Sequence, residues 1–193
     1  MATRARIIEA AADLVYAGGV GGTSLDDVLE ASVTSKSQLY HYFADKAALM
    51  QEVIILQTER VLGRQEPLLS KLDSMTGLRR WRDAMVEITR ASGGSGGCPV
   101  GSLASELADH SEQARALLTN SFQTWESYLA DGLQAMRDRA ELAPSADARD
   151  LATAIMTALQ GGLLLSKTTR TCRPLELALD MAIEHVVRHL PSA

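Results

Sequence analysis

Residues 35–46 carry polar side chains whose types and spacing suit the recognition of nucleic acid. The candidate groups are hydroxyls, an amide, an imidazole and two ammonium groups, on Ser35, Lys36, Ser37, Gln38, Tyr40, His41, Tyr42 and Lys46. Residues 35–44 contain no acid, whereas an ordinary surface helix uses glutamate and lysine together. Such side chains hydrogen-bond to phosphate oxygens and to base edges in the major groove of DNA. The competing interpretation is an amphipathic helix that exposes a few tyrosines.

Two short helices are predicted to position these side chains. The first begins with Ser24 as a hydroxyl cap and Asp27 at its third position, and the second begins in the same way with Ser35 and Gln38. Apolar residues at helical spacing mark the buried sides, at Leu25, Val28 and Leu29 in the first helix and at Leu39 and Phe43 in the second. Asp45 then caps a third helix, which begins at Lys46. Two short helices joined by a tight turn form a helix-turn-helix.

The same stretch resembles the DNA-binding domain of the TetR family of bacterial transcriptional regulators. The family pattern has a short helix near Thr-Thr/Ser, a turn, and then Ser-Lys-x-x-Leu-Tyr-x-x-Phe-x-x-Lys-x-x-Leu, and residues 35–49 match every fixed position. The resemblance implies that Arg4, Thr23 and Ser35 lie near the DNA. We expect Lys36, Ser37 and Gln38 to read base edges, and Tyr40, His41, Tyr42 and Lys46 to contact phosphates. The amide of Gln38 suits adenine, although its capping role competes for the same atoms.

One departure from the family pattern lies in the turn. The family often has Gly-Val there, where this chain has Val33-Thr34. Glycine suits a left-handed backbone conformation, which a β-branched residue tolerates poorly. The turn therefore either adopts another conformation or is strained.

Composition indicates a soluble globular protein. The chain has 193 residues, no apolar run of about 18 residues, and an N-terminus unlike a signal peptide. Its two cysteines, Cys98 and Cys172, are far apart and fit no metal-ligand spacing. We expect a reduced cytoplasmic protein with no membrane partner, no bound metal and no cofactor.

Charge limits how the protein can bind DNA. The net charge is −5, and residues 1–60 contain five cations and eight acids. This balance argues against indiscriminate binding to nucleic acid. A few well-placed cations imply few phosphate contacts per subunit and a modest dependence of affinity on salt.

The remaining apolar spacing predicts helices and no strand. The expected ranges are 3–17, 46–62, 78–91, 112–139, 145–169 and 174–189, with a mobile glycine-rich loop at 92–102 and a domain boundary at Pro67. Gly161 and Gly162 fall in mid-helix, where each costs about 1 kcal/mol relative to alanine. A close helix approach or a cavity should offset that cost. The predicted fold is all-α, with a three-helix helix-turn-helix DNA-binding domain (1–48) and a larger helical effector-binding and dimerisation domain (49–193).

Residues 97–107 also resemble the family branch that has an LmrA/YxaF-like C-terminal domain. The family resemblance implies a homodimer formed by the last two helices and a pocket for a small-molecule effector. Residues that could line the pocket are apolar, aromatic or weakly polar: Trp81, Met85, Cys98, Leu103, Phe122, Trp125, Tyr128, Met156 and Gln160. Because few charges fall among them, we expect a mostly apolar ligand. The implied protein is a repressor that leaves a palindromic operator in double-stranded DNA when this ligand binds.

Parts of the sequence are compatible with two other functions. Cys98 lies in the glycine-rich loop and could serve a thiol-responsive regulator, but no second cysteine is near it in sequence. His185 and His189 stand four apart and could begin a metal site in an enzyme. The sequence offers no third ligand at a suitable spacing and no nucleophile motif, so an enzyme is not expected.

Overall fold

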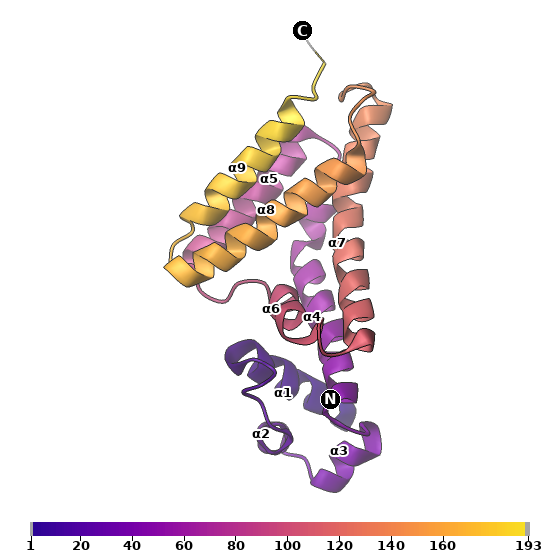
Figure 1. Ribbon diagram of the computed structural model, residues 1–193, viewed down its shortest axis with the longest axis vertical. Helices are drawn as coiled ribbons and strands as arrows, with labels where there is room; N and C mark the ends of the chain where they lie inside the picture. Colours follow the sequence, from indigo (N-terminus) through magenta and orange to yellow (C-terminus); the bar gives the residue numbers. More distant parts are fainter. Residues whose placement is uncertain (1, 192–193) are drawn as a thin grey trace. The chain divides into compact units, whose positions relative to one another are not determined.

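The computed structural model describes residues 2–191, and α-helix is the only extended regular structure among them (Figure 1). The helices are α1 (Thr3–Gly18), α2 (Leu25–Ser32), α3 (Lys36–Tyr42), α4 (Lys46–Leu69), α5 (Met75–Ala91), α6 (Pro99–Leu107), α7 (Glu112–Asp138), α8 (Ala148–Thr169) and α9 (Arg173–Val187). The all-α prediction is confirmed. In the described residues, none of these helices combines the length and apolar content that crossing a membrane requires.

The chain folds into two compact units. The first unit contains the chain up to Gly63 together with Pro99–Ser121, and the second contains Arg64–Cys98 together with the chain from Phe122 onward. The first unit thus adds α6 and the first parts of α4 and α7 to the predicted helix-turn-helix domain. The two units describe which parts of the chain pack together, and they do not separate functions. The functional division after residue 48 stays a prediction.

The core of the first unit unites α1 to α4. Its fully buried side chains come from each of these helices, at Ile7, Ala11, Val28, Leu39, Leu49 and Val53. Arg60 of α4 forms ion pairs with two acids of α1, Glu9 and, at 2.8 Å, Asp13. The buried amide nitrogen of Gln57 donates to the Ala12 carbonyl at 3.0 Å. These bonds support the small helices that carry the candidate DNA-binding residues.

In the second unit, α8 and α9 pack tightly against each other. A Cβ on Gly162 would lie 2.8 Å from the Cα of Leu175, so glycine permits a close helix approach there. The neighbouring Ser166 hydroxyl is buried and accepts a hydrogen bond from the Leu175 N–H at 3.3 Å. The expected compensation therefore exists for Gly162. A Cβ on Gly161 would meet nothing within 4 Å, and nothing in the structure explains that glycine.

Several helix boundaries differ from the prediction, and a physical reason is clear at three of them. Helix α4 continues through Pro67 to Leu69, because the proline lies in its last turn. Proline has no N–H to donate to the carbonyl of Gly63, four residues earlier, but Gly63 is exposed to water. The loop after α5 ends at Cys98, since Pro99 starts α6. Helix α8 begins after Asp147, whose carboxylate accepts from the N–H groups of Arg149 and Asp150, and Ser145 does not cap it.

Candidate nucleic-acid interface and ligand site

The turn between α2 and α3 is strained. Val33 has φ 51° and ψ 52°, which is the left-handed region, and its side chain is 82% exposed. Its N–H donates to the Glu30 carbonyl at 3.2 Å, and the Thr34 N–H donates to the Leu29 carbonyl at 3.1 Å. These bonds close the C-terminus of α2 in the manner of a Schellman motif. Of the two alternatives left by the sequence, the structure has the strained one.

Helix α3 exposes its polar side and buries its apolar side. Leu39 and Phe43 anchor it in the core of the first unit. The side chains predicted to meet DNA are exposed at Ser35, Lys36, Ser37, Gln38, Tyr40, His41 and Tyr42. The rings of His41 and Tyr42 meet edge to face, with centroids 4.8 Å apart. The face needed for groove recognition is therefore not consumed by packing inside the first unit.

The side-chain oxygen of Gln38 is already used in the cap of α3. It accepts from the Ser35 N–H at 2.9 Å, while the Ser35 hydroxyl accepts from the Gln38 N–H at 3.2 Å. A bidentate contact to adenine needs both the oxygen and the nitrogen of the amide. In this conformation only the NH₂ group of Gln38 remains for a base, so it suits a single acceptor such as purine N7.

Lys46 and Thr23 hold the loop between α1 and α2. The ammonium of Lys46 donates to the carbonyls of Val20 and Thr23, both at 2.6 Å. Thr23 is buried, and its hydroxyl donates to the Gly19 carbonyl at 2.9 Å. Two of the three N–H donors of Lys46 thus act inside the protein. Both side chains position the domain, and any DNA contact by either of them stays a prediction.

Arg4 combines exposure with two contacts inside the first unit. Its guanidinium pairs with Glu52 at 2.7 Å and lies 5.6 Å from the centroid of the Phe43 ring. The Phe43 contact places Arg4 beside the end of α3. Glu52 neutralises part of the charge of Arg4. This ion pair agrees with the expectation that the domain makes few phosphate contacts.

Sequence reasoning missed Glu106 of α6, which binds the loop between α1 and α2. Its carboxylate accepts from the N–H groups of Val20 at 2.8 Å and Gly21 at 3.2 Å. Gly19, with φ 78°, lies so close that an added Cβ would be 3.0 Å from a carboxylate oxygen. No local signal could have revealed this contact, because about 85 residues separate the partners.

Asp27 completes the cap of α2. Its carboxylate accepts from the Ser24 hydroxyl and from the Ser24 N–H, both at 2.7 Å. These two hydrogen bonds, the hydroxyl first, lower the pKa of Asp27 below its ordinary value. The predicted capping boxes at Ser24 and Ser35 are both confirmed.

The predicted ligand residues are mostly buried, and most belong to the second unit. Trp81, Met85, Cys98, Trp125 and Met156 are buried there, while Phe122 and Gln160 are half-buried. Tyr128 is 37% exposed, so it lies at the surface of its own unit, and its place in a ligand site stays a prediction. Leu103 is buried in the first unit.

The alternative chemistries gain little from the geometry. Cys98 is a buried thiol, and the Cys172 thiol contacts the Glu176 carboxylate at 3.6 Å. The rings of His185 and His189 meet edge to face with centroids 5.2 Å apart. Within residues 2–191, no three histidine, cysteine or acidic side chains gather as a metal site would require.

Two family profiles and several known proteins are similar to this chain. The profile described as "Bacterial regulatory proteins, tetR family" matches residues 7–53, and the profile "Transcriptional regulator LmrA/YxaF-like, C-terminal domain" matches residues 74–181, more than half of the chain. An uncharacterized HTH-type transcriptional regulator in the lacX 3' region of Lactococcus lactis is 31% identical over 189 residues, covering 93% of this chain and 90% of that protein. The HTH-type transcriptional regulator UidR of Escherichia coli K12 is 28% identical, covering 94% and 85%.

The fold also matches solved structures. The crystal structure of a TetR transcriptional regulator from Chloroflexus aurantiacus superposes with a TM-score of 0.83 at 24% identity, covering 99% of this chain and 97% of that one. The chain therefore belongs to the TetR family of bacterial transcriptional regulators, in the branch with an LmrA/YxaF-like C-terminal domain, and is a DNA-binding regulator and not an enzyme.

Proposed function

We propose that the protein is a dimeric repressor that binds a palindromic operator in double-stranded DNA and leaves it when a small, mostly apolar effector binds the larger domain. The observation that carries this proposal is α3, whose polar side is exposed while Leu39 and Phe43 are buried. The protein would act in the cytoplasm, where bacterial DNA lies.

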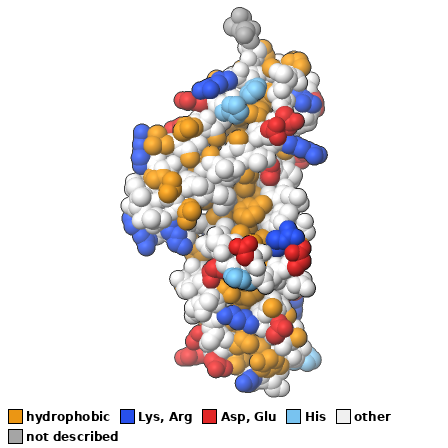
Figure 2. Space-filling model, viewed as in Figure 1, with side chains coloured by type: hydrophobic (Ala, Val, Ile, Leu, Met, Phe, Trp, Pro, Cys, Tyr) orange, Lys and Arg blue, Asp and Glu red, His pale blue; other side chains and the backbone are white. Residues whose placement is uncertain are grey.

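An apolar face on α8 and α9 supports dimerisation through these two helices. Four large apolar side chains are exposed on them, at Leu164, Leu165, Leu177 and Met181. Figure 2 shows hydrophobic side chains gathered over this part of the second unit. A second copy of the chain, related by a two-fold axis, would cover the same face on both subunits.

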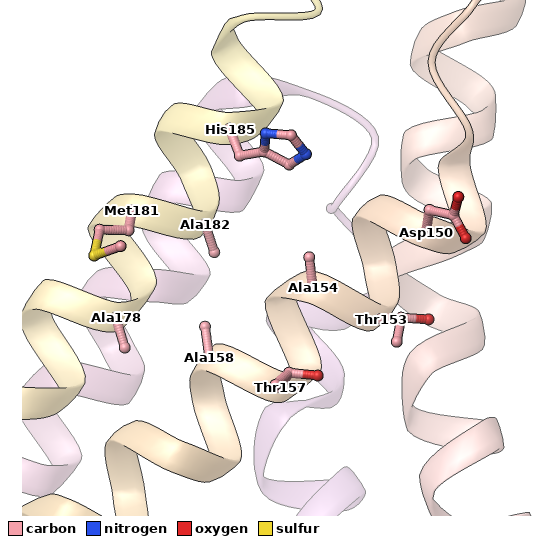
Figure 3. Close-up of a pocket in the computed structure, with 9 residues that line it drawn as sticks. All are labelled: Asp150, Thr153, Ala154, Thr157, Ala158, Ala178, Met181, Ala182 and His185. Atoms are coloured by element: carbon pink, nitrogen blue, oxygen red, sulfur yellow. The ribbon is translucent and has the colours of Figure 1, made fainter.

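A groove runs along this face between α8 and α9 and has a volume of about 690 Å³. Figure 3 shows Ala154 and Ala158 of α8 pointing toward Ala178 and Ala182 of α9 across it. Met181 also lines the groove and is 69% exposed. Small side chains beside an exposed methionine provide the holes and the knob that helix packing between two copies requires.

Dimerisation gives the recognition helix enough sequence to read. One seven-residue helix contacts few base pairs, whereas two such helices about 34 Å apart read successive major grooves. The palindrome of the operator would then reflect the two-fold symmetry of the protein.

Two routes can transmit effector binding to α3. Helix α4 runs without a break from Lys46 at the end of the helix-turn-helix to Leu69 in the second unit. Helix α6 follows the glycine-rich loop of the second unit and binds the α1–α2 loop through Glu106. A coupling free energy of about 1–3 kcal/mol would release the DNA, and DNA would lower effector affinity by the same factor.

DNA selected from a random pool by the full-length protein tests this function. We expect one enriched palindrome, and we expect Gln38→Glu to reduce discrimination at one base pair per half-site by about 1–3 kcal/mol. This change keeps an oxygen for the Ser35 cap and removes the NH₂ donor. Gln113→Glu adds the same charge at an exposed position of another helix, α7, and serves as the control.

The readout is a mobility-shift competition over operator variants. A loss in Gln38→Glu that is equal at every base pair would show that Gln38 does not read bases. Failure of the selection to enrich any sequence would argue against the repressor itself.

A further inference from the structure

Trp125 of α7 has a buried indole N–H that finds no hydrogen-bond partner in residues 2–191. Its side chain is only 3% exposed, so surface water does not solvate this group. The buried side-chain nitrogen of Gln160 in α8 is in the same condition within that range. Nearly all buried polar groups in folded proteins are hydrogen-bonded, so each exception calls for an explanation, of which a bound molecule is one.

The corresponding group of the other tryptophan is hydrogen-bonded. The indole N–H of Trp81, the other tryptophan, donates to the side-chain oxygen of Gln65 at 2.9 Å. Arg82 Nε is also buried without a partner in the described residues. The terminal nitrogens of Arg82, however, bind Asp83 and Asp180, both at 3.0 Å, so its charge is already compensated. The neutral donors of α7 and α8 are therefore the groups left for a ligand.

The two donors lie on neighbouring helices of the second unit. The Thr153 hydroxyl of α8 donates to the carboxylate of Glu126, which adjoins Trp125 on α7. Gln160 lies seven residues beyond Thr153, roughly 10 Å along α8. Met156 precedes Gln160 by one turn and is buried. A ligand that reaches both donors would also meet the apolar side chain of Met156, so we expect it to be largely apolar.

We propose that Trp125 and Gln160 recognise the effector, and that the effector is a neutral, largely apolar molecule that carries carbonyl oxygens. This inference rests on the proposed function, because it describes the ligand of that effector site. A carbonyl oxygen accepts a hydrogen bond from an indole or amide N–H without bringing a charge into the interior. A carboxylate or phosphate would need a buried cationic partner, and the guanidinium of Arg82 is already paired with Asp83 and Asp180.

Nuclear magnetic resonance of the two indole N–H groups tests the assignment in the full-length protein. Labelling with ¹⁵N-indole tryptophan gives two signals, and Trp125→Phe identifies which one belongs to Trp125. The probes are 2-acetylnaphthalene and 2-ethylnaphthalene, which have nearly the same size and differ in the carbonyl. We expect the ketone to move the Trp125 signal downfield and slow its exchange with solvent, while the Trp81 signal stays in place.

Affinity supplies the second readout. The ketone should bind about tenfold more tightly than the hydrocarbon, because one buried hydrogen bond contributes roughly that factor. Trp125→Phe and Gln160→Leu keep apolar bulk and should each reduce this preference. Gln123→Leu, at an exposed position of α7, should leave it unchanged. Equal binding of the two probes, no binding of the ketone up to its solubility, or an unmoved Trp125 signal would overturn the assignment.

DNA binding without any probe separates this inference from the proposed function. A protein that binds its selected DNA but has no carbonyl preference remains a regulator, and only the ligand assignment fails. A protein that prefers the ketone but enriches no DNA keeps the ligand assignment and loses the repressor.

Discussion

At the scale of single residues, the helix-turn-helix depends on a few backbone groups with special requirements. Val33 takes a left-handed conformation at the end of α2, although its branched side chain packs against little. Ser24 and Ser35 satisfy N–H groups at the starts of α2 and α3, and Asp27 and Gln38 return the bond. These local devices fix where each short helix begins and ends, and so which side chains α3 presents.

Val33→Gly should stabilise the protein. Glycine adopts the left-handed region without the clash of a Cβ, which costs about 1–2 kcal/mol in other residues. The greater entropy of glycine in the unfolded chain offsets part of this gain. We expect a net increase of about 0.5 kcal/mol in the free energy of unfolding, measured by urea denaturation. Val33→Ala retains a Cβ and should gain less; an equal gain from both would attribute the effect to something other than backbone strain.

The cap of α2 should weaken in acid. Because the pKa of Asp27 is lowered in the folded state by its bonds to Ser24, the carboxylate stabilises the fold above its unfolded pKa. That contribution is lost as the pH falls through the folded pKa. Ser24→Ala removes the larger cause and should raise the pKa of Asp27, as a ¹³C carboxyl titration would measure. An unmoved Asp27 titration in the Ser24→Ala protein would contradict this account.

At the scale of elements, the loop between α1 and α2 is held from two directions. Lys46, at the start of α4, binds its carbonyls, and Glu106 of α6 binds its N–H groups. The loop leads directly into Ser24, the cap of α2. Charged side chains from elsewhere in the first unit therefore bind both N–H groups and carbonyls of this loop.

Glu106→Ala should loosen this loop. The N–H groups of Val20 and Gly21 lose their acceptor, so their amide hydrogen exchange should quicken by about 5- to 30-fold, which corresponds to about 1–2 kcal/mol. DNA affinity should fall as well, because the loop positions α2. Glu112→Ala, at the exposed start of α7, is the matched control. Unchanged exchange at Val20 and Gly21 would rule out Glu106 as their anchor in solution.

At the scale of the whole molecule, the proposed repressor needs two copies of the chain. The exposed apolar side chains of α8 and α9 remain in contact with water in a single chain. A monomeric protein rarely tolerates a contiguous patch of this kind without using it. The lining of the groove is small and apolar at its centre, with Asp150 and His185 also on its walls.

Met181→Glu should break the dimer without unfolding the subunit. The side chain is exposed in the single chain, but in the proposed interface a charge would be buried without a partner. We expect the dimer dissociation constant to rise at least about 100-fold, measured by sedimentation, and operator binding to fall with it. Thr124→Glu, on the exposed side of α7, should change neither. A Met181→Glu protein that still sediments as a dimer would move the interface elsewhere.

The sequence by itself determined the local elements of this protein. Capping residues, helical apolar spacing and the 35–49 pattern predicted α2, α3 and the start of α4, because these features depend on neighbours within about four residues. It could not decide how Lys46 uses its ammonium, since that group binds the carbonyls of Val20 and Thr23, which are far from it along the chain. Tertiary structure alone brought Glu106 to a loop 85 residues away and, within residues 2–191, left the indole N–H of Trp125 without a hydrogen-bond partner. Hydrogen bonding of buried groups depends on what folding places beside them, and spacing along the chain does not encode that.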